Sequence, residues 1–133
     1  MSEEARVLAG ILLLSLVTVE TGGLYLLKLW RKPGEATPFQ LGFARAGHAH
    51  AGVLLLLGLV CLLYVDTAGL GGFTGWLARA GVPVAAILMP AGFFFSSMGQ
   101  GRERPNALVV LVYAGGAMLA AGLATLGVGL LAA

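Results

Sequence analysis

Three ionisable side chains lie inside long apolar stretches of the sequence: Glu20, His48 and His50. Carboxylates and imidazoles are common ligands of Zn, Fe and Cu ions, and a neutral imidazole also ligates haem b. An ionised group at the centre of a bilayer costs about 2.5–3.5 kcal/mol on the insertion scale, so membrane-embedded acids and histidines usually mark functional sites. We therefore expect Glu20 and the segment with His48 and His50 to hold a transition-metal ion or haem if these segments span a membrane.

The composition indicates that lipid is the main solvent of this chain. Of its 133 residues, 59% are apolar and only 11% are charged, and the mean hydropathy is +0.94. Soluble domains carry about 25% charged residues, so this chain cannot cover a water-facing surface. It also lacks the basic face that a nucleic-acid partner requires. The single cysteine, Cys61, lies in an apolar run and excludes both an internal disulfide and a cysteine-based metal cluster.

Four apolar segments are long enough to be transmembrane helices, since a helix needs about 20 residues to cross the hydrocarbon core. They cover about residues 7–29, 43–64, 79–98 and 107–131, and glycine, proline or charge marks the short connections between them. The first segment lacks a signal-peptide cleavage pattern, so we interpret it as a retained helix. The sequence thus predicts one all-α domain, an antiparallel bundle of four transmembrane helices that is either monomeric or homo-oligomeric. Asn106 is the expected N-cap of the fourth helix.

Basic residues predict how the helices are oriented. Arg6 and Arg79 fall on one side of the membrane, and the other six basic residues lie beside the first and third connections. Because cytoplasmic loops carry the excess of Lys and Arg, the chain is expected to cross the cell (inner) membrane with both termini on the outside. The six residues on the expected cytoplasmic side are Lys28, Arg31, Lys32, Arg45, Arg102 and Arg104.

Glu20 and the histidines are expected to lie at one level of this membrane. At a rise of about 1.5 Å per residue, Glu20 lies about 13 Å from the inner end of its helix, and His50 lies a similar depth into the next one. The short connection makes these two helices antiparallel neighbours. The sequence therefore predicts that Glu20 and a histidine share a buried pocket near the inner leaflet.

The two histidines are two residues apart, so on a helix they point about 200° away from each other and cannot both chelate one ion without distortion. One is expected to face the bundle, and the other to face lipid, a neighbouring subunit or the head-group region. His48 shares its face with Ala44, Ala51 and Gly52, and this small-residue face favours His48 as the inward histidine.

Four further residues are expected to support the cluster. Tyr113 is expected to be buried, with its hydroxyl within reach of Glu20 and the histidines. Ser96 and Ser97 are expected to bond back to the preceding helical turn. Met98 is either packing material or a soft ligand.

The run from Arg45 to Val60, RAGHAHAGVLLLLGLV, resembles the histidine-bearing helix of haem–copper oxidase catalytic subunits. In those subunits a histidine at the start of an apolar helix ligates the low-spin haem, so the resemblance implies that His48 or His50 is a haem ligand. This chain has no third histidine to match the other ligands of that family. The whole chain also resembles an uncharacterised family of small four-helix bacterial integral membrane proteins that carry the same GHAHAG run.

Three functional hypotheses follow from these residues. The first is a protein that binds a metal ion or haem through the Glu/His cluster and has a redox or electron-transfer role. The second is an oligomeric proton-linked permease or channel, in which Glu20 and a histidine relay protons. The third is an accessory subunit of a larger membrane complex, in which the polar residues hold helices together. No set of nucleophile, base and orienting group is visible, so the sequence names no reaction.

Overall fold

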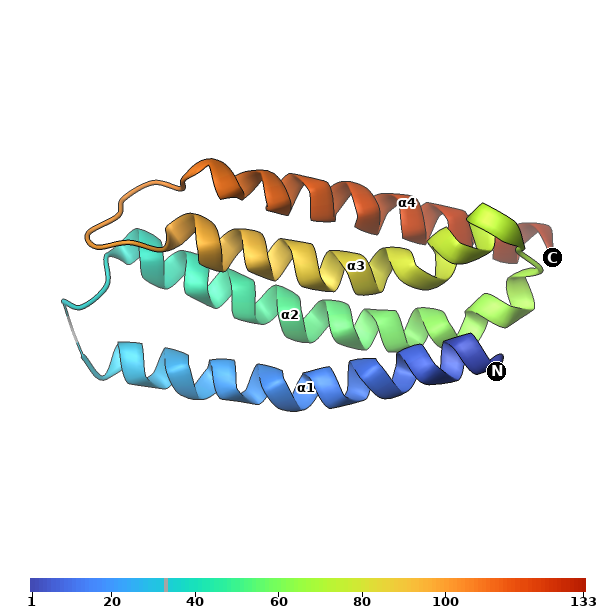
Figure 1. Ribbon diagram of the computed structural model, residues 1–133, viewed down its shortest axis with the longest axis horizontal. Helices are drawn as coiled ribbons and strands as arrows, with labels where there is room; N and C mark the ends of the chain where they lie inside the picture. Colours follow the sequence, from blue (N-terminus) through green and yellow to red (C-terminus); the bar gives the residue numbers. More distant parts are fainter. Residues whose placement is uncertain (33) are drawn as a thin grey trace.

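The computed structural model describes residues 1–32 and 34–133, and it is built from four long helices. Two short 3-10 turns, η1 and η2, precede the third and fourth helices. Figure 1 shows the long helices running side by side in alternating directions, with both chain ends at one end of the molecule. This arrangement confirms the predicted all-α four-helix fold. The elements are α1 (Glu3–Trp30), α2 (Pro38–Tyr64), η1 (Val65–Ala68), α3 (Gly72–Ser97), η2 (Ala107–Val109) and α4 (Val110–Ala132).

All four helices are long and apolar enough to cross a membrane. The candidate spans are Glu3–Trp30, Pro38–Ala68, Gly72–Ser97 and Ala107–Ala132, each with 26 residues or more. A helix of about 20 residues already covers the hydrocarbon core, so every span has residues to spare at the interfaces. These helices agree with the prediction that the chain is a membrane protein with several spans.

The helices pack in chain order: α1 on α2, α2 on α3, and α3 on α4 (Figure 1). The most buried large side chains are Leu62 on α2 and Val82 on α3, which lie in the two central helices. By contrast, the outer helices α1 and α4 leave most of their apolar residues exposed. The central pair therefore forms the core, and α1 and α4 flank it.

Glycine allows α3 and α4 to approach each other closely. A Cβ added at Gly81 would lie 2.7 Å from the Gly122 Cα, and one added at Gly122 would lie 3.0 Å from the Gly81 Cα. In lipid, small residues at a crossing replace the missing hydrophobic drive with close backbone packing. A glycine also allows close packing on α2, because Gly58 makes room for Leu12 of α1 and Pro83 of α3.

The start of α2 corrects the prediction that this helix begins near Phe43. The helix begins at Pro38, where Thr37 accepts a hydrogen bond from the Gln40 amide and the Gln40 side chain accepts one from the Thr37 amide. This reciprocal arrangement is a capping box, and proline fits the first helical turn because its missing N–H has no helical partner there.

The start of α3 also differs from the predicted position near Arg79. The helix begins at Gly72, so the glycine-rich segment expected to be a loop contains η1 and the first turns of α3. Gly69 ends η1 with φ 63°, a left-handed conformation that favours glycine. At the fourth helix, Asn106 caps the chain as predicted, since its side chain accepts a hydrogen bond from the Leu108 amide.

Asp66 links three elements at the end of the molecule that holds the chain termini. Its Oδ2 accepts a hydrogen bond from the Ser2 amide at 2.5 Å and lies 3.7 Å from the N-terminal ammonium. Its Oδ1 lies 3.6 Å from the Arg79 guanidinium of α3. Asp66 in η1 therefore connects the beginning of α1 to α3.

Candidate functional site

His48 lies between α2 and α1, against two glycines of α1. A Cβ added at Gly22 would lie 3.1 Å from His48 Nδ1, and one added at Gly23 would lie 3.5 Å from Cε1 and 3.6 Å from Nε2. The imidazole is partly buried. Because a larger side chain at Gly22 would press on the ring, the Gly22–Gly23 pair provides the space that lets this histidine sit at the helix contact.

His50 packs against α3 instead. Its ring centroid lies 4.9 Å from that of Phe93, with the two planes tilted by 36°. Its Nδ1 lies 2.7 Å from the Ala46 carbonyl oxygen, and because a carbonyl only accepts, Nδ1 is the donor. The second histidine was expected to face lipid, a subunit or the head groups. That expectation was wrong, because both imidazoles are partly buried against a neighbouring helix, His48 against α1 and His50 against α3.

Glu20 lies on the side of α1 that is not packed against α2, which we call the open side of α1. Its residue is exposed, and the hydrogen bonds and ion pairs of the described residues do not include its carboxyl group. The neighbouring threonines satisfy their hydroxyls within α1: Thr18 donates to the Ser15 carbonyl at 2.7 Å and Thr21 to the Thr18 carbonyl at 2.6 Å. Unlike Thr18 and Thr21, Glu20 has no hydrogen bond to its own helix among the described residues.

Glu20, His48 and His50 do not form one cluster. Glu20 is only one turn from Gly23, so it lies near the depth of the His48 ring, but it is exposed and His50 is on the far side of α2. Within residues 1–32 and 34–133, no group of three or more His, Cys, Asp or Glu side chains is placed to hold a metal ion. The described part of one chain thus does not fit a metal ion through these three residues, and a ligand from a second chain would be required.

Tyr113 corrects another expectation. Tyr113 is 72% exposed on α4 and is not buried beside Glu20 and the histidines. The expectation was wrong because the helices pack in chain order: α4 lies on α3 with only minor contact to α2, and α1 lies at the other side of the molecule (Figure 1).

The supporting serines behave as the sequence predicts. Ser97 Oγ donates to the Phe94 carbonyl at 3.0 Å, and Ser96 Oγ lies 3.5 Å from the Phe93 carbonyl, both one turn back along α3. Both serines are buried, and Met98, which follows them, is 61% exposed. The Ser96 hydrogen bond is long and therefore weak, but the Ser96 side chain is fully buried.

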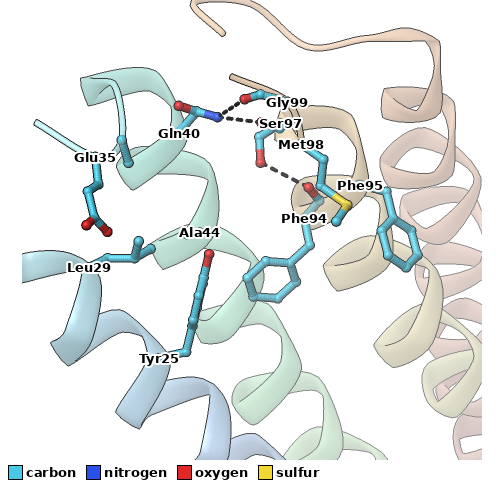
Figure 2. A pocket seen from close by; sticks show the side chains of 11 residues that line it. Tyr25, Leu29, Glu35, Gln40, Ala44, Phe94, Phe95, Ser97, Met98 and Gly99 are labelled. Carbon is cyan, nitrogen blue, oxygen red and sulfur yellow. Dashed lines mark hydrogen bonds between the residues drawn. The ribbon is translucent and has the colours of Figure 1, made fainter. Parts of the chain in front are cut away.

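A pocket that the sequence did not indicate lies between α1, α2 and the end of α3, at the end of the molecule opposite the chain termini. Its volume is about 430 Å³. Figure 2 shows Tyr25 of α1 and Phe94 of α3 on its walls, with Glu35 and Gln40 at the loop end. The Gln40 side chain donates to the Gly99 carbonyl at 2.7 Å and to the Ser97 carbonyl at 3.0 Å, so it fixes the end of α3 over the pocket.

One sequence signal could have directed attention to this pocket. Thr37 and Gln40 have the spacing of a capping box, which marks a helix start and places Gln40 in the first turn of α2. No comparable signal exists for Tyr25 and Phe94, because aromatic residues in apolar helices are common packing material and their meeting depends on the tertiary arrangement.

A second hollow lies on the flank of α1 and α2 next to His48. Its volume is about 300 Å³, and His48, Arg45 and Trp30 contribute to its lining. It brings an imidazole, a guanidinium and an indole together near the end of α1 and the start of α2. Comparisons of the chain with protein-family models, curated proteins and solved structures return no match.

Proposed function

We propose that the protein is an accessory subunit of a larger membrane complex and that it binds its partner through the open side of α1. The observation that carries this proposal is the exposed Glu20 carboxyl group. Glu20 is 17 residues after Glu3 and 10 before Trp30, which corresponds to about 25 Å and 15 Å along the helix axis. Both distances put the carboxyl group well inside a hydrocarbon core about 30 Å thick.

A carboxyl group in that position is costly in lipid. The charged form costs about 2.5–3.5 kcal/mol on the insertion scale, and the neutral form still has an O–H and a C=O that hydrocarbon cannot satisfy. A partner helix with a donor or a cation at the same depth removes this cost. The open side of α1 has room for such a helix, because α1 packs mainly on α2.

The basic residues of this chain favour a different protein over a second copy. Most of the described Lys and Arg side chains lie near the helix ends or in the connections, and His48 is partly buried. Arg45 is the exception nearest to Glu20 in depth, and it lies about two turns inside α2, closer to the helix end than Glu20 is. A second copy therefore offers little positive charge at the depth of Glu20. A different transmembrane protein can supply it.

Purification from the native membrane in mild detergent tests this function. The wild-type chain is expected to co-purify with a second membrane protein in a fixed ratio. Glu20→Leu is expected to lose the partner, and Glu20→Gln, which keeps the hydrogen bonds, is expected to retain part of it. Recovery of the wild-type chain alone, or only as copies of itself, would contradict the proposal.

A metal ion or haem held between chains is a second candidate function. It is supported by His50, because a histidine whose Nδ1 donates to a backbone carbonyl presents Nε2 as a free ligand nitrogen, as metal-bound histidines do. It is also in line with the resemblance of Arg45–Val60 to the oxidase helix. An absorption spectrum and a metal analysis of protein from its native membrane test it, and the lack of both a haem band and a stoichiometric metal would remove it.

The proposed orientation puts both termini outside the bacterial inner membrane. The six basic residues near the α1–α2 and α3–α4 connections support it, because cytoplasmic loops carry the excess of Lys and Arg. Single cysteines introduced at Ser2 and at Gln100, in a Cys61→Ala background, test it with a membrane-impermeant thiol reagent. Labelling at position 2 in intact cells is expected. Labelling only at position 100 would show the opposite orientation.

A further inference from the structure

We propose that the pocket between α1, α2 and the end of α3 (Figure 2) binds an aminophospholipid, with the primary ammonium of the lipid head group beside Glu35. This site is separate from Glu20 and does not depend on the accessory-subunit function. The pocket of about 430 Å³ falls in the range of ligand pockets, roughly 300–1,000 Å³.

The depth of the pocket matches a lipid head group. Tyr25 is five residues before Trp30, the last residue of α1, so it lies about 8 Å inside the helix end. Glu35 and Gly99 lie beyond the ends of α1 and α3, in the connections. The pocket therefore extends from the membrane interface into the outer part of the hydrocarbon core.

The apolar part of the pocket suits the start of an acyl chain. Figure 2 shows the Tyr25 and Phe94 rings on neighbouring walls, with Leu29 and Ala44 on the α1 and α2 sides. Tyr25 is 52% exposed, so the wall that it forms is open to a ligand in the bilayer. The face of an aromatic ring also attracts a cation that lies over it.

The polar part of the pocket consists mostly of acceptors. The Ser97 and Gly99 carbonyls each accept one hydrogen bond from Gln40, and a carbonyl oxygen has a second lone pair. The Glu35 carboxylate meets Lys32 through Oε1 at 3.0 Å, which leaves its other oxygen for a second donor. Within the described lining residues there is no Lys, Arg or His. A ligand that donates hydrogen bonds and carries a positive charge fits this lining.

A zwitterionic head group also matches the ion pair at the rim. The ammonium would lie beside Glu35, and the phosphate of the same head group would lie beside Lys32, so each charge of the lipid meets its opposite. A primary ammonium has three N–H donors. A quaternary ammonium has none, so it cannot use the carbonyl acceptors. An anionic lipid without an amine would bring a negative charge towards Glu35.

Native mass spectrometry of the detergent-solubilised full chain tests this proposal. The chain is titrated with phosphatidylethanolamine, phosphatidylcholine and phosphatidylglycerol that carry the same acyl chains. Phosphatidylethanolamine is expected to bind roughly tenfold more tightly than the other two, the factor that one charge-assisted hydrogen bond supplies. Glycerophosphoethanolamine, which has the head group and no acyl chains, is expected not to displace it.

Two variants and a matched control complete the test. Glu35→Gln is expected to remove the preference for the primary amine, and Tyr25→Leu is expected to weaken binding of that lipid. Glu103→Gln, a change of an exposed acid in the connection between α3 and α4, is expected to leave the preference unchanged. Equal binding of the three lipids, a preference that survives Glu35→Gln, or displacement by the soluble head group would overturn the proposal.

Discussion

Gly22 of α1 lies so close to His48 of α2 that a single added carbon would come within 3.1 Å of the His48 Nδ1 atom. A glycine on one helix thus makes room for a large polar ring on the next. The contact fixes how α1 is rotated on α2, and with that rotation Glu20 faces away from the bundle.

Replacement of Gly22 by valine should separate α1 from α2. Overpacking of a helix contact costs about 1–3 kcal/mol, so the unfolding midpoint in detergent is expected to fall. The loss should shrink in a His48→Ala background, where the ring is absent. Gly10→Val is the matched control, because a Cβ at Gly10 has nothing within 4 Å. Equal effects of the two valines would show that the glycine–imidazole contact does not matter for stability.

Replacement of Gly81 by alanine should disrupt the crossing of α3 and α4. The added methyl group would lie 2.7 Å from the Gly122 Cα, and two backbones cannot yield as a flexible side chain can. We expect a loss of about 1–3 kcal/mol, measured by thermal unfolding in micelles. Gly116→Ala in α4 serves as the control, since its Cβ meets open space and alanine favours a helix by about 0.5–1 kcal/mol. An unchanged midpoint for Gly81→Ala would contradict the close crossing.

Replacement of Gln40 by leucine should release the end of α3. The change removes the bonds to Ser97 and Gly99 and half of the capping box, and each net hydrogen bond is worth about 0.5–1.5 kcal/mol. Faster hydrogen exchange is expected at the start of α2 and in the connection after Ser97. Gln100→Leu, in the same exposed connection, is expected to leave exchange there as it is in the wild type. If both variants exchange alike, Gln40 does not tie these elements.

Replacement of Asp66 by asparagine should loosen the first turn of α1. The asparagine side chain would keep an acceptor for the Ser2 amide but lose the attraction to the N-terminal ammonium and Arg79. Faster exchange is expected at the N-terminal end of α1, and Glu3→Gln, which removes only an exposed pair with Arg6, should have little effect. A protected first turn in Asp66→Asn would argue against the tether.

Hydropathy predicts the helices of this protein because each must cover about 30 Å of hydrocarbon, and that requirement appears as length and apolar content. The helix starts were harder to predict. At Thr37 and Gln40 the decisive signal is a short capping box outside the apolar run, and at Gly72 the chain continues as a helix through residues that are typical of loops.

The site was predicted less completely for a different physical reason. Residue types and depth indicate that Glu20 and His48 lie at a similar level, but they do not determine how each helix is rotated about its axis. Rotation depends on small contacts such as Gly22 against His48 and Gly58 against Leu12. The order of packing, which separates Tyr113 on α4 from α1, likewise depends on which helix faces fit each other.

Site-specific photo-crosslinking on α1 tests the central claim most directly. A benzophenone side chain at Leu24, which is 68% exposed and one turn from Glu20, is introduced in the native membrane, with the same probe at the exposed Val128 of α4 as the control. The proposed function predicts an adduct with a second, different membrane protein at position 24, which disappears with Glu20→Leu. Adducts with lipid alone, or a protein adduct that persists with Glu20→Leu, would contradict it.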